Sequence, residues 1–197
     1  MDILGFLTSI KIFDLLVFFL CFGMFVLGFI QGTIRRVLGI ASMLFSFLLA
    51  LNLRGSLGAY LAENWRQFPG EYAVMLGTLI VFIAATIAFT LVIQGFYHHQ
   101  TLFKKATFAD EVIGGILGVV QALLLVLCII VILDSFFRIP TLPQTDGELP
   151  FLRQTWQAIN ESATAGVFRS VIIPAFISIF GFLVPGDVKG LYVALIH

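Results

Sequence analysis

Two carboxylates, Asp14 and Asp134, stand at the ends of long apolar stretches of the sequence, where a pair of acids could bind a proton or a cation. Asp134 falls at a predicted helix C-terminus, where a carboxylate opposes the helix dipole and needs a cationic partner. Arg138, one helical turn further on, and Lys11 are the candidates, and Asp14 could share that partner. We expect both acids to be solvated at the ends of their helices rather than to form a proton or cation site.

A second group of charges, Arg35, Arg36, Asp110 and Glu111, is expected on the opposite side of the apolar region. Asp110 and Glu111 follow Thr107 at a predicted helix N-terminus, where the dipole and the free amide groups favour carboxylates. Because Arg35 and Asp110 lie on the same side, we predict an ion pair between them. Exposed pairs contribute only about 0 to 1 kcal/mol, so this pair matters only if it is partly desolvated.

The sequence carries no signature of an enzyme or of a metal site. His98 and His99 are adjacent, so their side chains diverge by about 100° on a helix, and no third ligand lies nearby. Ser56 does not stand in a nucleophile elbow, and there is no glycine-rich loop of the kind that cradles phosphates. Cys21 and Cys128 fall inside apolar runs, which is typical of small buried hydrophobes. We expect no enzymatic activity, no cofactor and no metal.

The amino-acid composition indicates the environment in which these charged and polar residues lie. Hydrophobic residues make up 60% of the 197 residues, 22 of them are phenylalanine, and the mean hydropathy is +1.07, which indicates an integral membrane protein in contact with lipid. Eleven basic and eleven acidic side chains give a net charge of zero, which argues against a nucleic-acid partner.

Four stretches are each about long enough to cross the roughly 30 Å hydrocarbon core of a bilayer as a helix. They cover residues 12–30, 37–53, 73–96 and 112–133. The first lacks the basic start and the cleavage site of a signal peptide, so we expect a retained helix. The predicted fold is an all-α membrane protein, with four transmembrane helices in a bundle over residues 1–137 and interfacial or re-entrant helices at the C-terminus.

The segments outside the spans predict further elements. A short amphipathic helix along the membrane interface is indicated by apolar residues at helical spacing, namely Leu57, Tyr60, Leu61, Trp65 and Phe68. Three prolines and a glycine in residues 138–150 predict an extended connector. A helix lying on the membrane follows, with one apolar face made by Phe151, Leu152, Thr155, Trp156 and Ile159.

The end of the C-terminal region, residues 151–197, leaves alternatives open. Residues 170–184 would span only about 22 Å as a helix, and Pro174 interrupts them, so we favour a re-entrant or interface-buried helix. A hydrophobic terminal helix packed on the bundle is one alternative. The other is a fifth span reaching back to Ala163, which would bury Arg169 in hydrocarbon unless that side chain pairs or reaches the interface.

Small residues at four-residue steps bring membrane helices close together. Such rows occur in the first, second and fourth spans: Gly28 and Gly32; Ser42, Ser46 and Ala50; Gly114, Gly118 and Ala122. Polar side chains within the spans, among them Gln31, Gln94 and Gln121, are expected to form hydrogen bonds between helices. The alternative is that they line a path for ions or a small solute.

From residue 13 to about residue 185 the sequence resembles the colicin V production protein family of bacterial inner-membrane proteins. In the family's pattern, an Asp opens the first helix and a Gly-x-x-x-Gly-x-x-basic stretch closes it. The fourth helix begins with an Asp, continues with glycines at four-residue steps and ends with a further Asp. A Ser-x-x-x-Pro motif follows near the C-terminus. The pattern is matched here by Asp14, Gly28, Gly32, Arg35, Asp110, Gly114, Gly118, Asp134, Ser170 and Pro174. The sequence departs from the family at Gln31, Arg36, Glu111 and Ala122.

The resemblance implies a multi-pass protein of the bacterial inner membrane that is needed to produce or export a peptide toxin, with both termini in the periplasm. We expect a non-enzymatic module that recruits protein partners for secretion or envelope maintenance and that can form a homo-oligomer. The alternative function is a small oligomeric channel or transporter for ions or small solutes.

Overall fold

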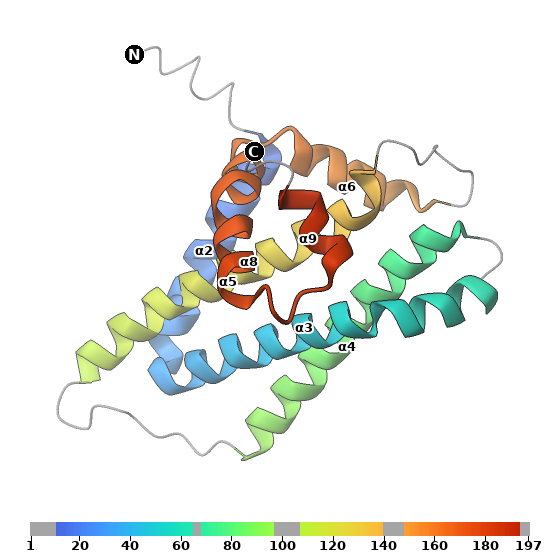
Figure 1. Ribbon diagram of the computed structural model, residues 1–197. Coiled ribbons are helices and arrows are strands. Elements are labelled where there is room, and N and C mark those ends of the chain that lie inside the picture. Colours follow the sequence, from blue (N-terminus) through green and yellow to red (C-terminus); the bar gives the residue numbers. More distant parts are fainter. Residues whose placement is uncertain (1–10, 65–67, 97–106, 140–147, 194–197) are drawn as a thin grey trace, which may run out of the picture.

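The computed structural model describes residues 11–64, 68–96, 107–139 and 148–193, and within these ranges the chain forms helices and no strand (Figure 1). Four long helices come first, followed by shorter ones at the C-terminus. Their bounds are α2 Ile12–Gln31, α3 Thr33–Asn64, α4 Gly70–Phe96, α5 Thr107–Phe137, α6 Pro150–Asn160, α7 Ala163–Val167, the π-helix η1 Phe168–Ile172, α8 Ile173–Phe180 and α9 Gly186–Val193.

Five helical segments are long and apolar enough to cross a membrane, which confirms the predicted all-α membrane fold. They cover Ile12–Gln31, Thr33–Leu61, Gly70–Ile93, Phe108–Phe137 and Ala163–Phe180. Many of their large apolar side chains are exposed, for example Ile12, Phe18 and Leu91 at 83%, 63% and 63%. Such surfaces suit a chain whose surrounding solvent is lipid.

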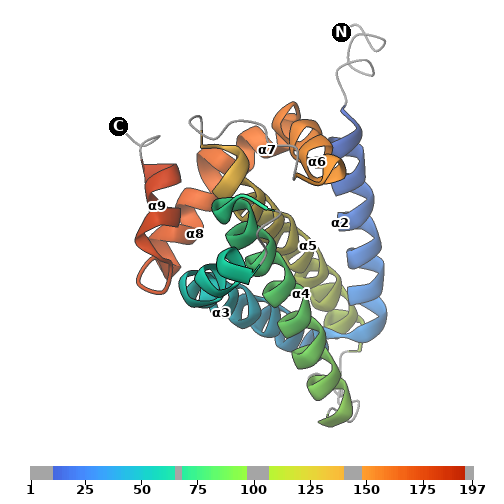
Figure 2. The same ribbon diagram turned by 90° about the vertical axis from the view of Figure 1, so that its right-hand side faces the viewer.

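The four long helices form two pairs. α2 packs along α5, α3 packs along α4, and α3 also crosses α5 (Figures 1 and 2). The buried core continues into the C-terminal helices, because the Phe47 ring of α3 lies 6.0 Å from the ring of Phe82 in α4 and 6.0 Å from that of Phe176 in α8.

The second long helix differs from the sequence prediction. α3 runs without interruption from Thr33 to Asn64, so the segment expected as a separate interface helix continues it instead. The reason is packing against α4: Gly58 lies against Val74, and Leu61 lies against Gly77, so this part of α3 has a partner within the bundle. Residues 65–67 lie outside the described residues.

The C-terminal region also differs in its boundaries. The helix expected from residue 170 begins at Ala163, where the Ser162 side chain accepts a hydrogen bond from the Ala165 amide at 3.0 Å. It then runs through η1 into α8. In α6, Leu152 and Ile159 of the predicted apolar face are buried, whereas Phe151 is 58% exposed. Most of the predicted connector, residues 140–147, lies outside the described residues.

The segment from α7 to α9 enters the bundle and returns. At its start, the Thr164 amide contacts Asp14 at the beginning of α2, and at its end, the Tyr192 hydroxyl contacts Asp134 near the end of α5. α2 and α5 are antiparallel neighbours (Figure 2), so the contacts at Asp14 and at Asp134 lie at the same end of the pair. The described chain therefore returns to the end of the helix pair at which α7 begins, and within it Ala163–Phe180 is long and apolar enough to be a fifth span.

Candidate functional site

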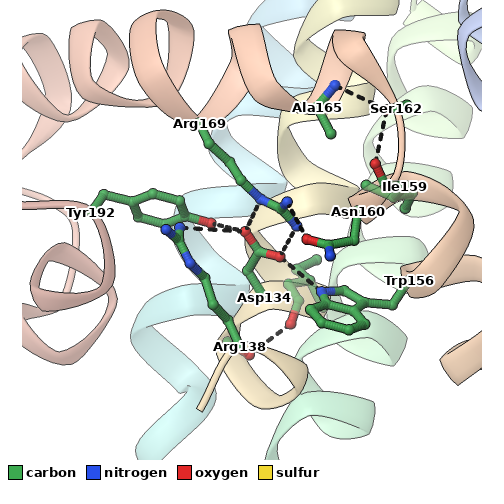
Figure 3. Close-up of polar contacts among 11 residues, drawn as sticks. Asp134, Arg138, Trp156, Ile159, Asn160, Ser162, Ala165, Arg169 and Tyr192 are labelled. Carbon is green, nitrogen blue, oxygen red and sulfur yellow. Dashed lines mark hydrogen bonds and ion pairs between the residues drawn. The ribbon is translucent and has the colours of Figure 1, made fainter. Parts of the chain in front are cut away.

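The main polar site is a buried ionic cluster around Asp134, whose side chain is fully buried in the last turn of α5 (Figure 3). Arg169 of η1 donates to both carboxylate oxygens, from Nε to Oδ2 at 2.8 Å and from Nη2 to Oδ1 at 2.6 Å. The Trp156 indole of α6 donates to Oδ1 at 3.0 Å, and the Tyr192 hydroxyl of α9 donates to Oδ2 at 3.0 Å. One carboxylate therefore ties three C-terminal elements to α5.

Arg169 reaches Asp134 from a turn of unusual geometry. Pro174 has no amide hydrogen and its ring clashes with the carbonyl four residues back, so the chain just before it widens into the π-helix η1, with a hydrogen bond from the Ile173 amide to the Phe168 carbonyl. Arg169 lies within that wide turn, and its remaining nitrogen, Nη1, donates to Asn160 Oδ1 at 2.7 Å. All three guanidinium nitrogens thus have an acceptor.

The cluster carries an excess of positive charge. Arg138 lies 3.9 Å from Asp134 Oδ2 and over the Tyr192 ring, 5.3 Å from its centroid. Burial, and after it the negative charge of Asp134, raises the pKa of the Tyr192 hydroxyl, so this group stays protonated and remains a donor. The two cations also offset the unfavourable position of a carboxylate at the C-terminal end of a helix. Because donors from η1, α6 and α9 occupy both of its oxygens, Asp134 fixes these three elements to the end of α5.

Asp14 has a separate role at the same end of the bundle. Its Oδ1 accepts the Thr164 amide hydrogen at 2.9 Å, so a side chain of α2 satisfies a free amide at the start of α7. The backbone amide of Lys11 donates to Asp14 Oδ2 at 3.4 Å, but the Lys11 side chain pairs with the exposed Glu161 at 3.4 Å. The predicted shared partner of Asp14 and Asp134 is therefore wrong, as is the prediction that Asp134 is solvated, because its strongest partner is Arg169, 35 residues away. The predicted contact with Arg138 is present as the longer ion pair.

The glycines of α2 and α5 bring these two helices into backbone contact. A Cβ atom added at Gly28 would meet the Gly114 carbonyl, and one added at Gly118 would meet the Met24 carbonyl, at distances that real Cβ atoms essentially never show. Gly32 ends α2 with φ 77°, a left-handed conformation that favours glycine. Such contacts suit helices that associate in lipid through close packing.

Polar contacts close the turn between α2 and α3 against α5. The Thr33 hydroxyl donates to the Asp110 carbonyl at 3.0 Å, and Gly32 lies beside the Asp110 carboxylate. The predicted ion pair between Arg35 and Asp110 is wrong, because no pair within 4.0 Å joins these two described residues. Asp110 is buried, and no donor in the ranges that the structure describes bonds its Oδ1.

Arg36, and not Arg35, turns toward α5. Its Nη1 donates to Gln121 Oε1 at 2.8 Å, and both residues line a cavity of about 230 Å³ together with Gln31. Gln31 and Gln121, two of the three glutamines that could line a path, thus share one cavity. The side chain of the third, Gln94, lies outside the described residues.

A larger cavity of about 710 Å³ lies between α3, α4 and the turn that joins α8 to α9. Two contacts to α3 hold the turn and the start of α9: Asn52 Nδ2 donates to the Leu183 carbonyl at 3.0 Å, and Arg54 pairs with Asp187 of α9 at 3.0 Å. These contacts add to the cluster in fixing the C-terminal helices on the bundle.

The remaining predicted groups have local roles or lie outside the described residues. Ser170 is exposed and its hydroxyl donates to the Gly166 carbonyl at 2.9 Å. Cys128 is buried and Cys21 is half-buried, and both are free thiols. His98 and His99 lie outside the described residues, and the part of the chain that the structure describes holds no group of three or more metal-binding side chains.

Sequence reasoning did not identify Trp156 and Tyr192 as hydrogen-bond donors to Asp134. For Arg169 a signal existed: a cation inside an apolar helix needs a partner, and so does an acid at a helix C-terminus. These complementary needs could have linked Arg169 to Asp134.

The long apolar helices, their lipid-facing side chains and the buried ion pair define a multi-pass helical membrane protein. The chain matches the colicin V production protein family over residues 13–173, and it belongs to that family. This confirms the resemblance drawn from Asp14, Asp134 and the spaced glycines. Comparison with curated proteins and with solved structures finds no match.

Proposed function

We propose that this protein is a non-enzymatic module of the bacterial inner membrane that supports the production or secretion of a peptide toxin, or the maintenance of the envelope. Membership of the colicin V production protein family supports the toxin-related role. In this proposal α6 to α9 form a rigid surface at one end of the bundle, and partner proteins dock on it.

The Asp134 cluster is the observation that carries the proposal. Its donors come from η1, α6 and α9, and they occupy both oxygens of a fully buried carboxylate. A group arranged in this way holds elements together and leaves no lone pair free for a reacting molecule. The contacts of Thr164 with Asp14 and of Tyr192 with Asp134 support a topology in which the start of α2 and the end of α9 lie on one side of the membrane, the periplasmic side in the family topology.

The test is restoration of toxin release in a colicin V-producing strain that lacks this protein. We expect the wild type and the control variant Glu161→Gln to restore the zone of growth inhibition around colonies, and Asp134→Asn to restore less at equal amounts in the membrane. Full activity of Asp134→Asn would contradict the proposal. Cross-linking followed by isolation from gently solubilised membranes should recover the same partner repeatedly, and recovery of none would count against the module.

A small oligomeric channel or transporter is the second candidate, and the polar cavity that joins Gln31 and Gln121 favours it. Liposomes containing the purified protein would then pass ions or small solutes. Lack of flux across a broad panel of solutes would exclude this function.

A further inference from the structure

The cavity beside Arg36 has the lining of an anion site. It lies among the end of α2, the start of α3, the last part of α4 and the middle of α5, and its volume is about 230 Å³. Its polar lining consists of Arg35, Arg36, Gln31, Gln121 and Thr90. Among the described residues that line it there are two guanidinium groups and no carboxylate.

Arg36 is a buried cation that has no counterion among the described residues. It is 5% exposed, and within the described part of the chain its side chain contacts neutral acceptors alone, Gln121 Oε1 at 2.8 Å and Met24 Sδ at 3.8 Å. No acceptor in the described residues bonds its Nε. In the described ranges, neither Arg35 nor Arg36 forms an ion pair within 4.0 Å.

This arrangement is unfavourable as it stands. A buried charge is stable when it is paired, and an unpaired guanidinium in a membrane protein is expensive. Both arginines also lie near the N-terminus of α3, where the helix dipole repels cations and attracts anions. The contrast with Arg169, all of whose nitrogens have acceptors, shows that the same chain pairs a buried guanidinium where an acid is available.

We propose that this cavity binds a phosphate-type anion, which either the headgroup of an anionic phospholipid or inorganic phosphate supplies. A guanidinium presents a planar set of donors that matches phosphate oxygens, and Arg35 and Arg36 bring two guanidinium groups to the lining of this cavity. Gln31, Gln121 and Thr90 add amide and hydroxyl groups. Leu27, which also lines the cavity, is 46% exposed, so the site borders on an apolar surface where the acyl chains of a lipid would lie.

The test uses the full chain purified in an uncharged detergent, with the thermal unfolding midpoint as the readout. One arm adds dioleoylphosphatidylglycerol against dioleoylglycerol, which has the same acyl chains and no phosphate. The other arm adds sodium phosphate against sodium chloride at equal ionic strength. We expect the unfolding midpoint to rise only when the added compound carries a phosphate group. A higher midpoint with the lipid alone identifies a headgroup site. A higher midpoint with inorganic phosphate identifies a site that is open to free anions. No rise in either arm overturns the proposal.

Three variants distinguish specific binding in this cavity from general attraction between anions and the positive charges of the protein. Arg35→Gln should raise about tenfold the concentration of the phosphate compound that gives half of the full shift in unfolding midpoint, because one charged donor is lost. Gln121→Glu places a carboxylate against Arg36, so it should fold without the anion and lose the response. Lys189→Gln removes one positive charge from α9, away from the cavity, and should respond as the wild type does. An unchanged response in Gln121→Glu, or an equal weakening in Lys189→Gln, overturns the proposal.

Discussion

Arg169 and Asp134 form a two-point ion pair across 35 residues of sequence, with nitrogen to oxygen distances of 2.8 and 2.6 Å. Asp134 is completely buried and the Arg169 side chain is 13% exposed. A pair so shielded from water is weakly screened by salt. It joins the C-terminal part of the chain to the most buried of the candidate spans.

Asp134→Asn should destabilise the protein strongly, because it leaves the Arg169 charge buried without a partner. Breaking a buried pair in this way costs about 3 to 5 kcal/mol. Unfolding by sodium dodecyl sulfate in mixed micelles measures the loss. As a control, Glu161→Gln breaks a pair whose side chains are 50% and 64% exposed, and should cost less than about 1 kcal/mol. Equal losses in the two variants would contradict the role of the cluster.

The double variant Asp134→Asn with Arg169→Gln should be less damaged than the sum of the two single variants. Once both charges are gone, neither is left buried alone, so the interaction free energy should be at least about 1 kcal/mol. The same unfolding measurement on the four proteins of the cycle gives this number. Simple additivity would show that the two side chains act independently.

Gly28→Ala should weaken the packing of α2 on α5, because the added methyl group would collide with the Gly114 carbonyl. Overpacking of this kind costs about 1 to 3 kcal/mol. Gly23→Ala is the matched control in the same helix, since a Cβ atom there meets nothing within 4 Å, and alanine should raise stability there by up to about 1 kcal/mol. Changes of the same sign at the two positions would contradict the close approach.

Tyr192→Phe should alter how stability depends on alkaline pH. Because the pKa of Tyr192 is raised in the folded state above its ordinary value of 10.0, its contribution is complete below that value and is lost as the pH rises beyond it. The wild type should therefore exceed Tyr192→Phe in unfolding free energy by about 1 kcal/mol at about pH 8, and the difference should shrink only above about pH 10. A difference that already disappears below about pH 9 would contradict the donor role of the hydroxyl.

Hydrophobic stretches were enough to locate the long helices, because a run of apolar residues in lipid has no other way to satisfy its backbone. The ends of the helices were harder to predict from the sequence. α3 extends to Asn64 since Gly58 and Leu61 fit against α4, and such a fit between two helices leaves no periodic signal in either one.

The charged partners were the least predictable part of the site. A spacing of one helical turn predicts Arg138 as the partner of Asp134, whereas Arg169 is brought there by the folding of α7 and η1. Likewise, Arg35 and Arg36 point about 100° apart on one helix, and only the packing of α2 on α5 decides that Arg36 faces Gln121. Sequence shows that a buried charge needs a partner, but tertiary packing selects it.

The most direct test of the role assigned to Asp134 is hydrogen exchange of backbone amides in the wild type and in Asp134→Asn, both in lipid nanodiscs. If the ion pair fixes the C-terminal helices, amides of residues 163–180 should exchange faster in the variant, while those of the α2 and α5 segments around Gly28 and Gly114 should not change. Equal exchange at residues 163–180 in both proteins would show that the pair does not hold these helices in place.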